Sequence, residues 1–443
     1  MPTPSLLIVP ARFKTGKLYS QIPTSGAGDF TVTRNTAARR FDSAGLVASV
    51  ASGIPRLDYY TSGGVTGCPA LLVEPAGTNL AFHSETWASG NNWTLDAVTR
   101  VTGSTSAFLA PDGTFTANAL SPTSANVFHG LYSNSLTQNL YASGTIYTQS
   151  AFFKAGGTNL PVSGSAGRYV QLTYTGGGQF TQNGYANFDL QLGTVAVVSG
   201  TSADTNRAAR IENYGNGWYR CSFTATCNAA GNGIGVLPVL VNASGNTRAQ
   251  SFAGVTGDIL YGWGAQLETG SVATSYIPTT AGTGSRSADV VSVSGAVSGS
   301  IGQTEGTVYL EMQADAAGTG QNFLYVGGNV NDSIVIGKSG VNCFFELKVS
   351  GTTLISQNVA LSGTPLKGAI AYANGNYAAY ANGNLLASGT TSRTPANPLT
   401  AIAISNFLNL PTINAPSAIM RVRAAALYTT RLTNAELATL TAP

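Results

Sequence analysis

The chain has 443 residues, a length that suits two or three domains better than one. Charged residues make up only 9% of it, against about 25% in ordinary globular proteins, while apolar residues make up 43%. This apolar content excludes a chain that stays disordered for lack of hydrophobicity. The formal net charge of +3 is carried by residues 1–60, where seven arginines and lysines outnumber three aspartates. There is no dense basic run, so we expect these charges to pair locally and not to bind nucleic acid.

The first 80 residues are expected to form an extended arm followed by a small β region. Residues 1–28 contain four prolines, which predicts an extended N-terminal arm. The apolar run Leu6–Val9 is too short for a signal-peptide core or a membrane span, so we expect no membrane insertion. Residues 29–80 are expected to form a small β attachment region whose short strands cover 30–33, 46–50, 57–59 and 70–73.

Residues 81–282 are expected to form a jelly-roll β-sandwich. Their apolar residues alternate with period two in several segments separated by glycine and asparagine clusters, and no window keeps a helical period. One of these segments contains Trp263 between Gly262 and Gly264, and we expect the two glycines to leave room for its indole ring. The alternating segments are 149–155, 168–174, 218–226 and 259–266.

A linker over 283–299 is expected to separate this unit from a second β-sandwich over 300–443. The dipeptides Asn374-Gly375 and Asn382-Gly383 predict two tight hairpin turns, because both residue types tolerate a positive φ. Thr433 and Glu436 form a capping-box pattern, which predicts one short helix near 433–440. The predicted fold class is therefore all-β, with a short N-terminal β-region followed by two β-sandwich domains.

The four cysteines are expected to be buried thiols of a protein made in a reducing cytoplasm. Cys221 and Cys227 lie six residues apart in one predicted strand, about 20 Å if it is straight, and this is too far for a disulfide.

No residue is expected to be catalytic, to bind a cofactor or to bind a metal. The two histidines, His83 and His129, have no nucleophile elbow nearby, and we interpret them as structural. The carboxylates, Glu212 among them, form no close pair in sequence of the kind a glycosidase needs in space. Asp332 could donate to Ca²⁺, but one aspartate is not a calcium motif.

Glycan binding would need aromatic platforms among neutral polar residues. The candidates set among asparagine, serine and glycine are Trp87, Trp93, Tyr372, Tyr377 and Tyr380. The alternative for each of them is packing in a core, and we expect core packing for Trp218 and Trp263.

Several segments, in order, resemble a family of bacteriophage tail-fibre and virion surface proteins. They are Phe30–Arg34, Pro55–Tyr59, Leu71–Leu80, Gly215–Ser222, Gly262–Glu268 and Thr274–Thr280. The resemblance covers about residues 29–290 and implies jelly-roll structure similar to a carbohydrate-binding module, without any catalytic residue. The segments 369–388 and 425–436 resemble concanavalin-like and laminin-G-like lectin domains.

The resemblance implies a non-enzymatic virion protein, a tail fibre or receptor-binding protein that contacts host surface glycan. It would be made in the host cytoplasm, displayed on the virion surface and attached to other virion proteins through its N-terminal region. Abundant small polar residues suit close packing of identical copies, and we expect a homotrimer. Two alternatives remain open: a capsid-attached fibre or decoration protein with a structural role only, and a tail-spike polysaccharide depolymerase.

Overall fold

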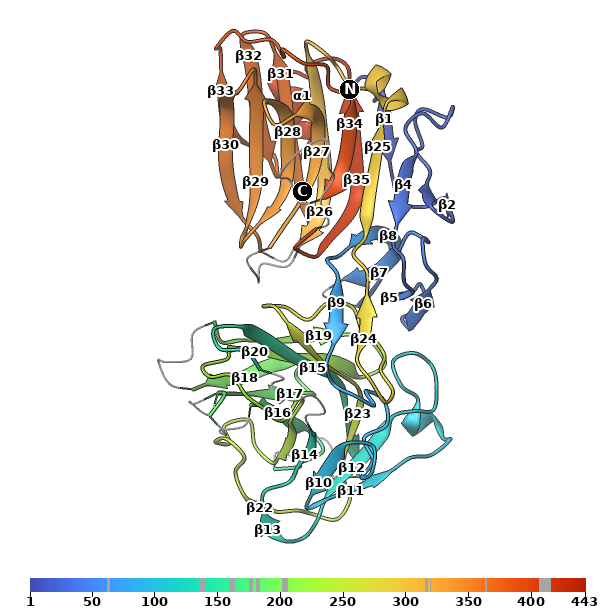
Figure 1. Ribbon diagram of the computed structural model, residues 1–443, viewed down its shortest axis with the longest axis vertical. Coiled ribbons are helices and arrows are strands. Elements are labelled where there is room, and N and C mark those ends of the chain that lie inside the picture. Colours follow the sequence, from blue (N-terminus) through green and yellow to red (C-terminus); the bar gives the residue numbers. More distant parts are fainter. Residues whose placement is uncertain are drawn as a thin grey trace.

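The computed structural model describes residues 1–443 except 62–63, 135–140, 159–163, 175–177, 181–183, 201–205, 315–317, 319, 363–364 and 406–415. Within this described part the chain is nearly all β, with two 3₁₀ helices, η1 (Ser106–Phe108) and η2 (Ala296–Ser300), and one α-helix, α1 (Asn434–Leu440). Two β-sandwiches lie one after the other along the long axis (Figure 1). The predicted all-β class is confirmed. No helix in the described ranges is both long and apolar enough to cross a membrane.

The terminal sandwich, so named because it holds both chain ends, has two antiparallel sheets. One has the order β33 (Asn384–Gly389), β32 (Asn376–Ala381), β31 (Leu366–Ala373), β26 (Gly306–Ala314), β35 (Met420–Tyr428), β8 (Gly64–Val73) and β7 (Leu57–Thr61), with β1 (Leu6–Ile8) also on β35. The other has the order β2 (Phe13–Lys14), β3 (Lys17–Leu18), β4 (Phe30–Thr33), β25 (Val290–Ser294), β34 (Ala401–Ser405), β27 (Gln321–Asn329), β28 (Asp332–Ser339), β29 (Asn342–Val349) and β30 (Thr352–Ala360).

The first 80 residues are part of this sandwich, which corrects two expectations. Residues 1–28 do not form an extended arm, because Leu6 pairs with Leu427 across β1 and β35, and its side chain is buried in the core. Residues 29–80 do not form a separate region either, since β4 pairs with β25 and β8 pairs with β35. Apolar side chains of β1, β4 and β8 complete a core that the C-terminal strands alone would leave open.

The central sandwich packs two six-stranded sheets over an aromatic core. One has the order β10 (Trp93–Asp96), β14 (Gly130–Ser133), β21 (Pro238–Val241), β16 (Tyr169–Thr173), β17 (Tyr185–Asp189) and β18 (Thr194–Ser199). The other has the order β11 (Val98–Val101), β12 (Asn118–Pro122), β23 (Asp258–Thr269), β15 (Ile146–Gly157), β20 (Trp218–Thr226) and β19 (Ala208–Asn213). A small pair, β13 (Asn126–Val127) and β22 (Phe252–Ala253), lies beside them.

The junction between the sandwiches is crossed twice by the chain (Figure 1). The chain leaves the terminal sandwich after β8 through β9 (Gly77–Asn79), and returns through β24 (Gly284–Arg286) to β25; β9 and β24 pair with each other. The hairpin of β5 (Ala38–Phe41) and β6 (Val47–Val50) lies beside this crossing. The prediction of a linker over 283–299 is therefore wrong, because this segment contains two paired strands and η2.

Both predicted hairpins and the predicted short helix are present near the C-terminus. The turn at Asn382-Gly383 has positive φ at both residues, as predicted, whereas in the turn between β31 and β32 only Gly375 has a positive φ and Asn374 does not. The Thr433 side chain accepts from the backbone N–H of Glu436, whose carboxylate accepts from Thr433 in return, so the capping box starts α1 as predicted. None of the four cysteines forms a disulfide, but Cys68 is exposed, which corrects the expectation of four buried thiols.

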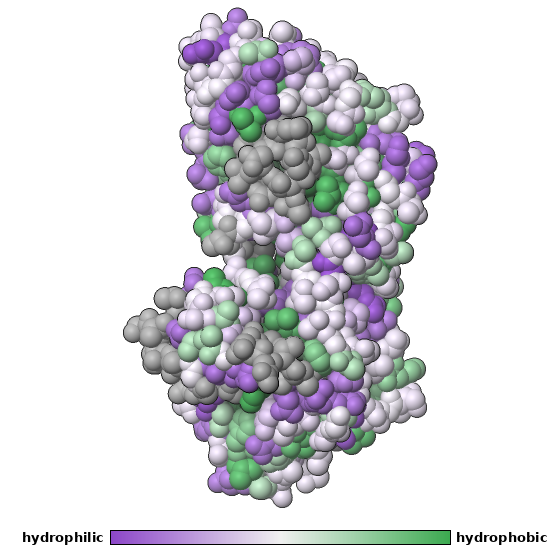
Figure 2. All heavy atoms as spheres, in the orientation of Figure 1, coloured by the Kyte–Doolittle hydropathy of each residue, from purple (hydrophilic) through white to green (hydrophobic). Residues whose placement is uncertain are grey.

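The surface mixes hydrophilic, intermediate and apolar residues in small areas, and the face seen in Figure 2 has no single broad apolar patch. This distribution agrees with a composition in which small polar residues replace most charges.

Candidate functional site

The junction is held by a buried group of charges, here the junction network: Arg34, Arg56, Glu74, Arg286 and Asp289. Glu74 lies just before the first crossing of the chain and Asp289 just after the second. The backbone N–H of Glu74 donates to the Asp289 carboxylate at 3.0 Å, and the backbone N–H of Asp289 donates to the Glu74 carbonyl at 3.0 Å. Arg56 donates to both carboxylates, at 2.6 Å to Glu74. Arg34 bonds Asp289 at 3.0 Å and Arg286 lies 3.3 Å from Glu74.

The three arginines and two carboxylates of the junction network are all buried, with exposed fractions of 2% or less for every side chain. Burial alone would raise the pKa of Glu74, but the charges of Arg286 and Arg56 and the Ser275 hydroxyl outweigh it and hold the pKa well below its ordinary range. Burial would lower the pKa of Arg56, but Asp289 and Glu74 outweigh it and raise the pKa. Glu74 and Arg56 therefore stay ionised at neutral pH.

The segments that carry the family resemblance meet at this junction. Asn79 donates to the carbonyls of Ala265 and Ile277, at 3.0 and 2.8 Å, and accepts from Leu267 N. Gln266 accepts from Ile277 N at 2.7 Å. These bonds fix the turn after β23 against β9, so Asn79 and Gln266 hold backbone segments of the junction together.

The predicted ligand residues Trp87 and Trp93 lie in the core, which corrects that expectation. They are 0% and 2% exposed and stack on each other with ring centroids 5.1 Å apart. The Trp87 indole N–H donates to Ser84 O, and its ring occupies the space over Gly262, where an added Cβ would lie 2.2 Å from a ring carbon. Gly262 thus makes room for Trp87, whereas Trp263 is buried with its N–H donating to Thr116.

Tyr372, Tyr377 and Tyr380 are also buried, with exposed fractions of 4%, 8% and 7%. Tyr372 donates to Gly302 O, and the first two rings belong to the core between the sheets of the terminal sandwich. Tyr380 packs beneath α1, in a cluster with Leu437. None of the five predicted aromatic residues presents a ring face to solvent, because neighbouring side chains of its sandwich cover each ring.

The remaining sequence candidates also have structural roles. His129 is buried and its two ring nitrogens bond Ala97 O and Phe252 O, at 2.8 and 2.9 Å. Asp332 accepts from backbone N–H groups of Ser350 and Ala396 and from the side chain of Asn397. These bonds lower its pKa against the opposing effect of burial. In the described ranges no group of three or more His, Cys, Asp or Glu is placed to hold a metal ion.

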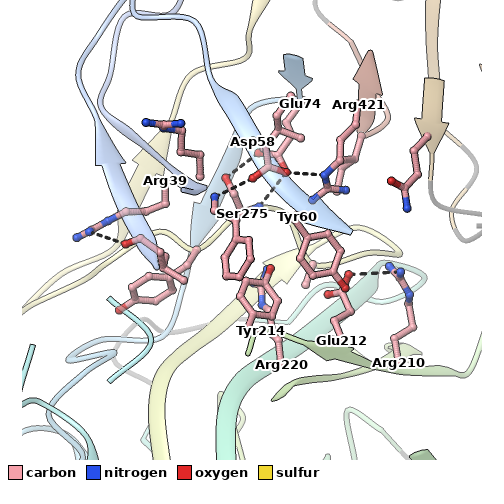
Figure 3. A pocket seen from close by; sticks show the side chains of 18 of the residues that line it. Arg39, Asp58, Tyr60, Glu74, Arg210, Glu212, Tyr214, Arg220, Ser275 and Arg421 are labelled. Atoms are coloured by element: carbon pink, nitrogen blue, oxygen red, sulfur yellow. Dashed lines mark hydrogen bonds and ion pairs between the residues drawn. The ribbon is translucent and has the colours of Figure 1, made fainter. Parts of the chain in front are cut away.

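A pocket of about 140 Å³ opens between the two sandwiches and is here the junction pocket (Figure 3). Its walls come from the β5–β6 hairpin, from β7, from β19 and β20 of the central sandwich, and from β26 and β35 of the terminal sandwich. The residues that line it include Arg39, Arg40, Phe41, Asp58, Tyr60, Glu74, Phe152, Arg210, Glu212, Tyr214, Arg220 and Arg421.

Two tyrosines form the aromatic wall of the junction pocket. The rings of Tyr60 and Tyr214 lie 5.2 Å apart, and Phe41 contacts both of them edge-on. Burial raises the pKa of Tyr214 to about 12, with a smaller contribution from the charge of Glu212. The same two causes raise the pKa of Tyr60 even more. Both hydroxyls are therefore protonated at neutral pH, and neither has a hydrogen-bond partner among the described residues.

Charged side chains form the rest of the wall. Arg421 lies 4.9 Å from the centroid of the Tyr60 ring, and its Nε donates to Asp58 at 2.6 Å. Asp58 also accepts from Phe41 N at 2.7 Å, so the carboxylate that orients Arg421 is itself fixed. Burial would lower the pKa of Arg421, but Asp58 outweighs it and raises the pKa. Arg210 and Glu212 pair at 3.5 Å beside the tyrosines (Figure 3).

No protein-family model matches the chain, and no curated protein matches it. Among solved structures it is similar to the Ruminococcus gnavus IT-sialidase CBM40 bound to alpha2,3 sialyllactose, with 16% identity, a TM-score of 0.27, and coverage of 32% of this chain and 84% of that one. It is also similar to the binding domain of botulinum neurotoxin DC in complex with rat synaptotagmin II, with 14% identity, a TM-score of 0.28, and coverage of 35% and 40%. At TM-scores this low, the likenesses carry no argument about the present chain.

The sequence did not reveal the junction pocket. Tyr60 and Tyr214 are separated by more than a hundred residues, and Arg421 comes from the other end of the chain. Of the residues that line the pocket, only Glu212 was named from the sequence, as one of the carboxylates that form no close pair there. The pocket exists because the two sandwiches are held against each other, and that arrangement depends on the junction network.

Proposed function

We propose that the chain is a non-enzymatic, glycan-binding protein of a bacteriophage virion surface, a tail fibre or receptor-binding protein whose ligand site is the junction pocket. The observation that carries the glycan-binding part is the pair of tyrosines with unbonded hydroxyls beside oriented charges. Sugars present C–H faces to aromatic rings and hydroxyl rims to polar groups, and this pocket offers both.

The arrangement supports binding in preference to hydrolysis. A glycosidase needs two carboxyl groups placed on either side of a scissile bond, one of them a proton donor. Of the carboxylates in the pocket, Asp58 is bonded to Arg421 and Phe41 N, and Glu74 belongs to the junction network. Glu212 is paired with Arg210.

The glycan-binding test uses the full-length chain on an array of host surface glycans, with a double variant Tyr60→Phe and Tyr214→Phe. The variant keeps both rings and their packing and removes only the two hydroxyls. We expect affinity for the bound glycans to fall about threefold to tenfold for each hydrogen bond lost. Tyr132→Phe, in the central sandwich away from the pocket, is the matched control and should bind as the wild type. Unchanged binding by the double variant would reject the junction pocket as the site.

The virion part of the proposal rests on the sequence resemblance and is tested separately. Mass spectrometry of purified particles should detect the chain, and a cryo-electron-microscopy map should place it on the tail or on the capsid. We propose a homotrimer attached to other virion proteins; light scattering of the purified chain should then give three times 45.3 kDa. A chain absent from particles would refute the virion role without touching glycan binding.

A further inference from the structure

We infer that the junction pocket selects sugars that carry a ring carboxylate, such as hexuronic acids, and that the guanidinium of Arg421 is the group that binds this carboxylate. The inference rests on the proposed glycan-binding function and names the substrate class of that same site.

The pocket has an excess of positive charge. Five arginines line it, whereas its carboxylates are Asp58, Glu74 and Glu212. Glu74 is neutralised from outside the pocket by two arginines of the junction network, and the other two acids offset Arg421 and Arg210. The three remaining arginines have no ion-pair partner among the described residues: Arg39 and Arg40 donate to backbone carbonyls, and Arg220 to Thr274 O and Ser150 Oγ.

One of these arginines also has an unused donor. Arg220 is 2% exposed, and its Nε is buried without a hydrogen-bond partner in the described part of the chain. The surplus of positive charge favours an anionic ligand over a neutral one.

Arg421 has the geometry to recognise a carboxylate. Asp58 holds its Nε at 2.6 Å and the Tyr60 ring lies beneath it, so the side chain is already ordered before a ligand arrives. The bond to Nε leaves the two terminal amino groups of the guanidinium to the pocket, where the side chain is 17% exposed (Figure 3). A planar guanidinium fits the two oxygens of a carboxylate through parallel hydrogen bonds.

The neighbouring groups fit the ring that would carry the carboxylate. Tyr60, which is 6% exposed, and the half-buried Tyr214 lie next to the guanidinium, and their protonated hydroxyls can each donate one hydrogen bond. Glu212 and Arg210 follow at the far side of the tyrosines and can bond sugar hydroxyls. The site thus combines one carboxylate position with a position for a hydroxyl-bearing ring.

The first test compares matched ligands on the unmodified protein, so that it requires no variant to fold. Isothermal titration uses oligogalacturonate, its methyl ester and the corresponding neutral galactose oligomer with the full-length chain. We expect the acid to bind at least about tenfold more tightly than the ester, because esterification removes the charge and one acceptor oxygen. Equal affinities would overturn the inference and leave glycan binding standing. The inference would also be overturned if none of these three probes bound and the glycan array showed binding of neutral glycans only. An array on which nothing binds would instead refute the proposed function.

The second test assigns the preference to Arg421. Arg421→Gln removes the positive charge, and Arg421→Lys keeps a positive charge beside Asp58 but lacks the planar guanidinium that can bind both oxygens of a carboxylate. Both variants should bind acid and ester with similar affinity, and the lysine variant should stay folded because the buried aspartate keeps a partner. Arg393→Gln, at an exposed position outside the pocket, should keep the full preference. A folded Arg421→Lys protein that retains the tenfold preference would overturn the assignment to this residue.

Discussion

The junction network makes a direct prediction about stability, for which Arg56→Met is the sharpest perturbation. Arg56 is 0% exposed and donates to both buried carboxylates, to Ser275 and to the carbonyl of Arg39. Methionine keeps much of the side-chain length but removes the charge and all donors. The substitution therefore leaves two buried carboxylates with less compensation than before.

The magnitude follows from what remains around each carboxylate. Removing one partner of a buried ion pair costs about 3–5 kcal/mol. Here Glu74 keeps Arg286 at 3.3 Å and Asp289 keeps Arg34 at 3.0 Å, so neither acid loses all of its counter-charge. We expect the lower end of that range, a loss of about 3 kcal/mol in the free energy of unfolding.

Urea unfolding, followed by two signals, measures this loss. All four tryptophans lie between residues 87 and 263, so their fluorescence reports the central sandwich, whereas circular dichroism reports strands of both sandwiches. In the wild type the two transitions should coincide, because the network ties the sandwiches together. In Arg56→Met they should separate and the first midpoint should fall.

Arg393→Met is the control, since that arginine is exposed and should change stability by less than about 0.5 kcal/mol. If Arg56→Met unfolds at the same urea concentration as this control, with coincident transitions, the reasoning about the junction is wrong.

Three further outcomes follow from the structure. The fragment 288–443 should be insoluble or lack a cooperative transition, because β1, β4 and β8 supply part of its core; a cooperative fragment would show that these strands are dispensable. The pKa of Glu74 in the folded protein lies below its ordinary value of 4.5, so its contribution to the free energy of unfolding is complete above about pH 4.5 and is lost as the pH falls further. Urea midpoints should therefore fall below this pH, and they should fall less steeply in Glu74→Gln than in the wild type. A thiol reagent should label Cys68 rapidly in the native protein and the three buried cysteines, Cys221, Cys227 and Cys343, only after unfolding, since burial raises the pKa of all three; rapid native labelling of more than one thiol would contradict the described burial.

The sequence by itself determined features that depend on neighbouring residues. Period-two alternation specified strands, because successive side chains of a strand point to opposite faces. The Asn382-Gly383 turn and the capping box of Thr433 and Glu436 were predictable for the same reason, since each is a hydrogen-bonding or backbone requirement met within a few residues. The absence of a helical period was enough to give the all-β class.

Only the tertiary structure decided which strands pair and which side chains are covered. Leu6 pairs with a residue more than 400 positions away, and no local pattern specifies such a partner. Trp87 was a candidate for glycan binding, but its ring is buried because Gly262 on β23 makes room for it. The junction pocket likewise depends on Tyr60, Tyr214 and Arg421 coming together from three distant strands or strand ends. Burial and charge pairing are properties of the packed layers, so the chain reveals them only once those layers have met.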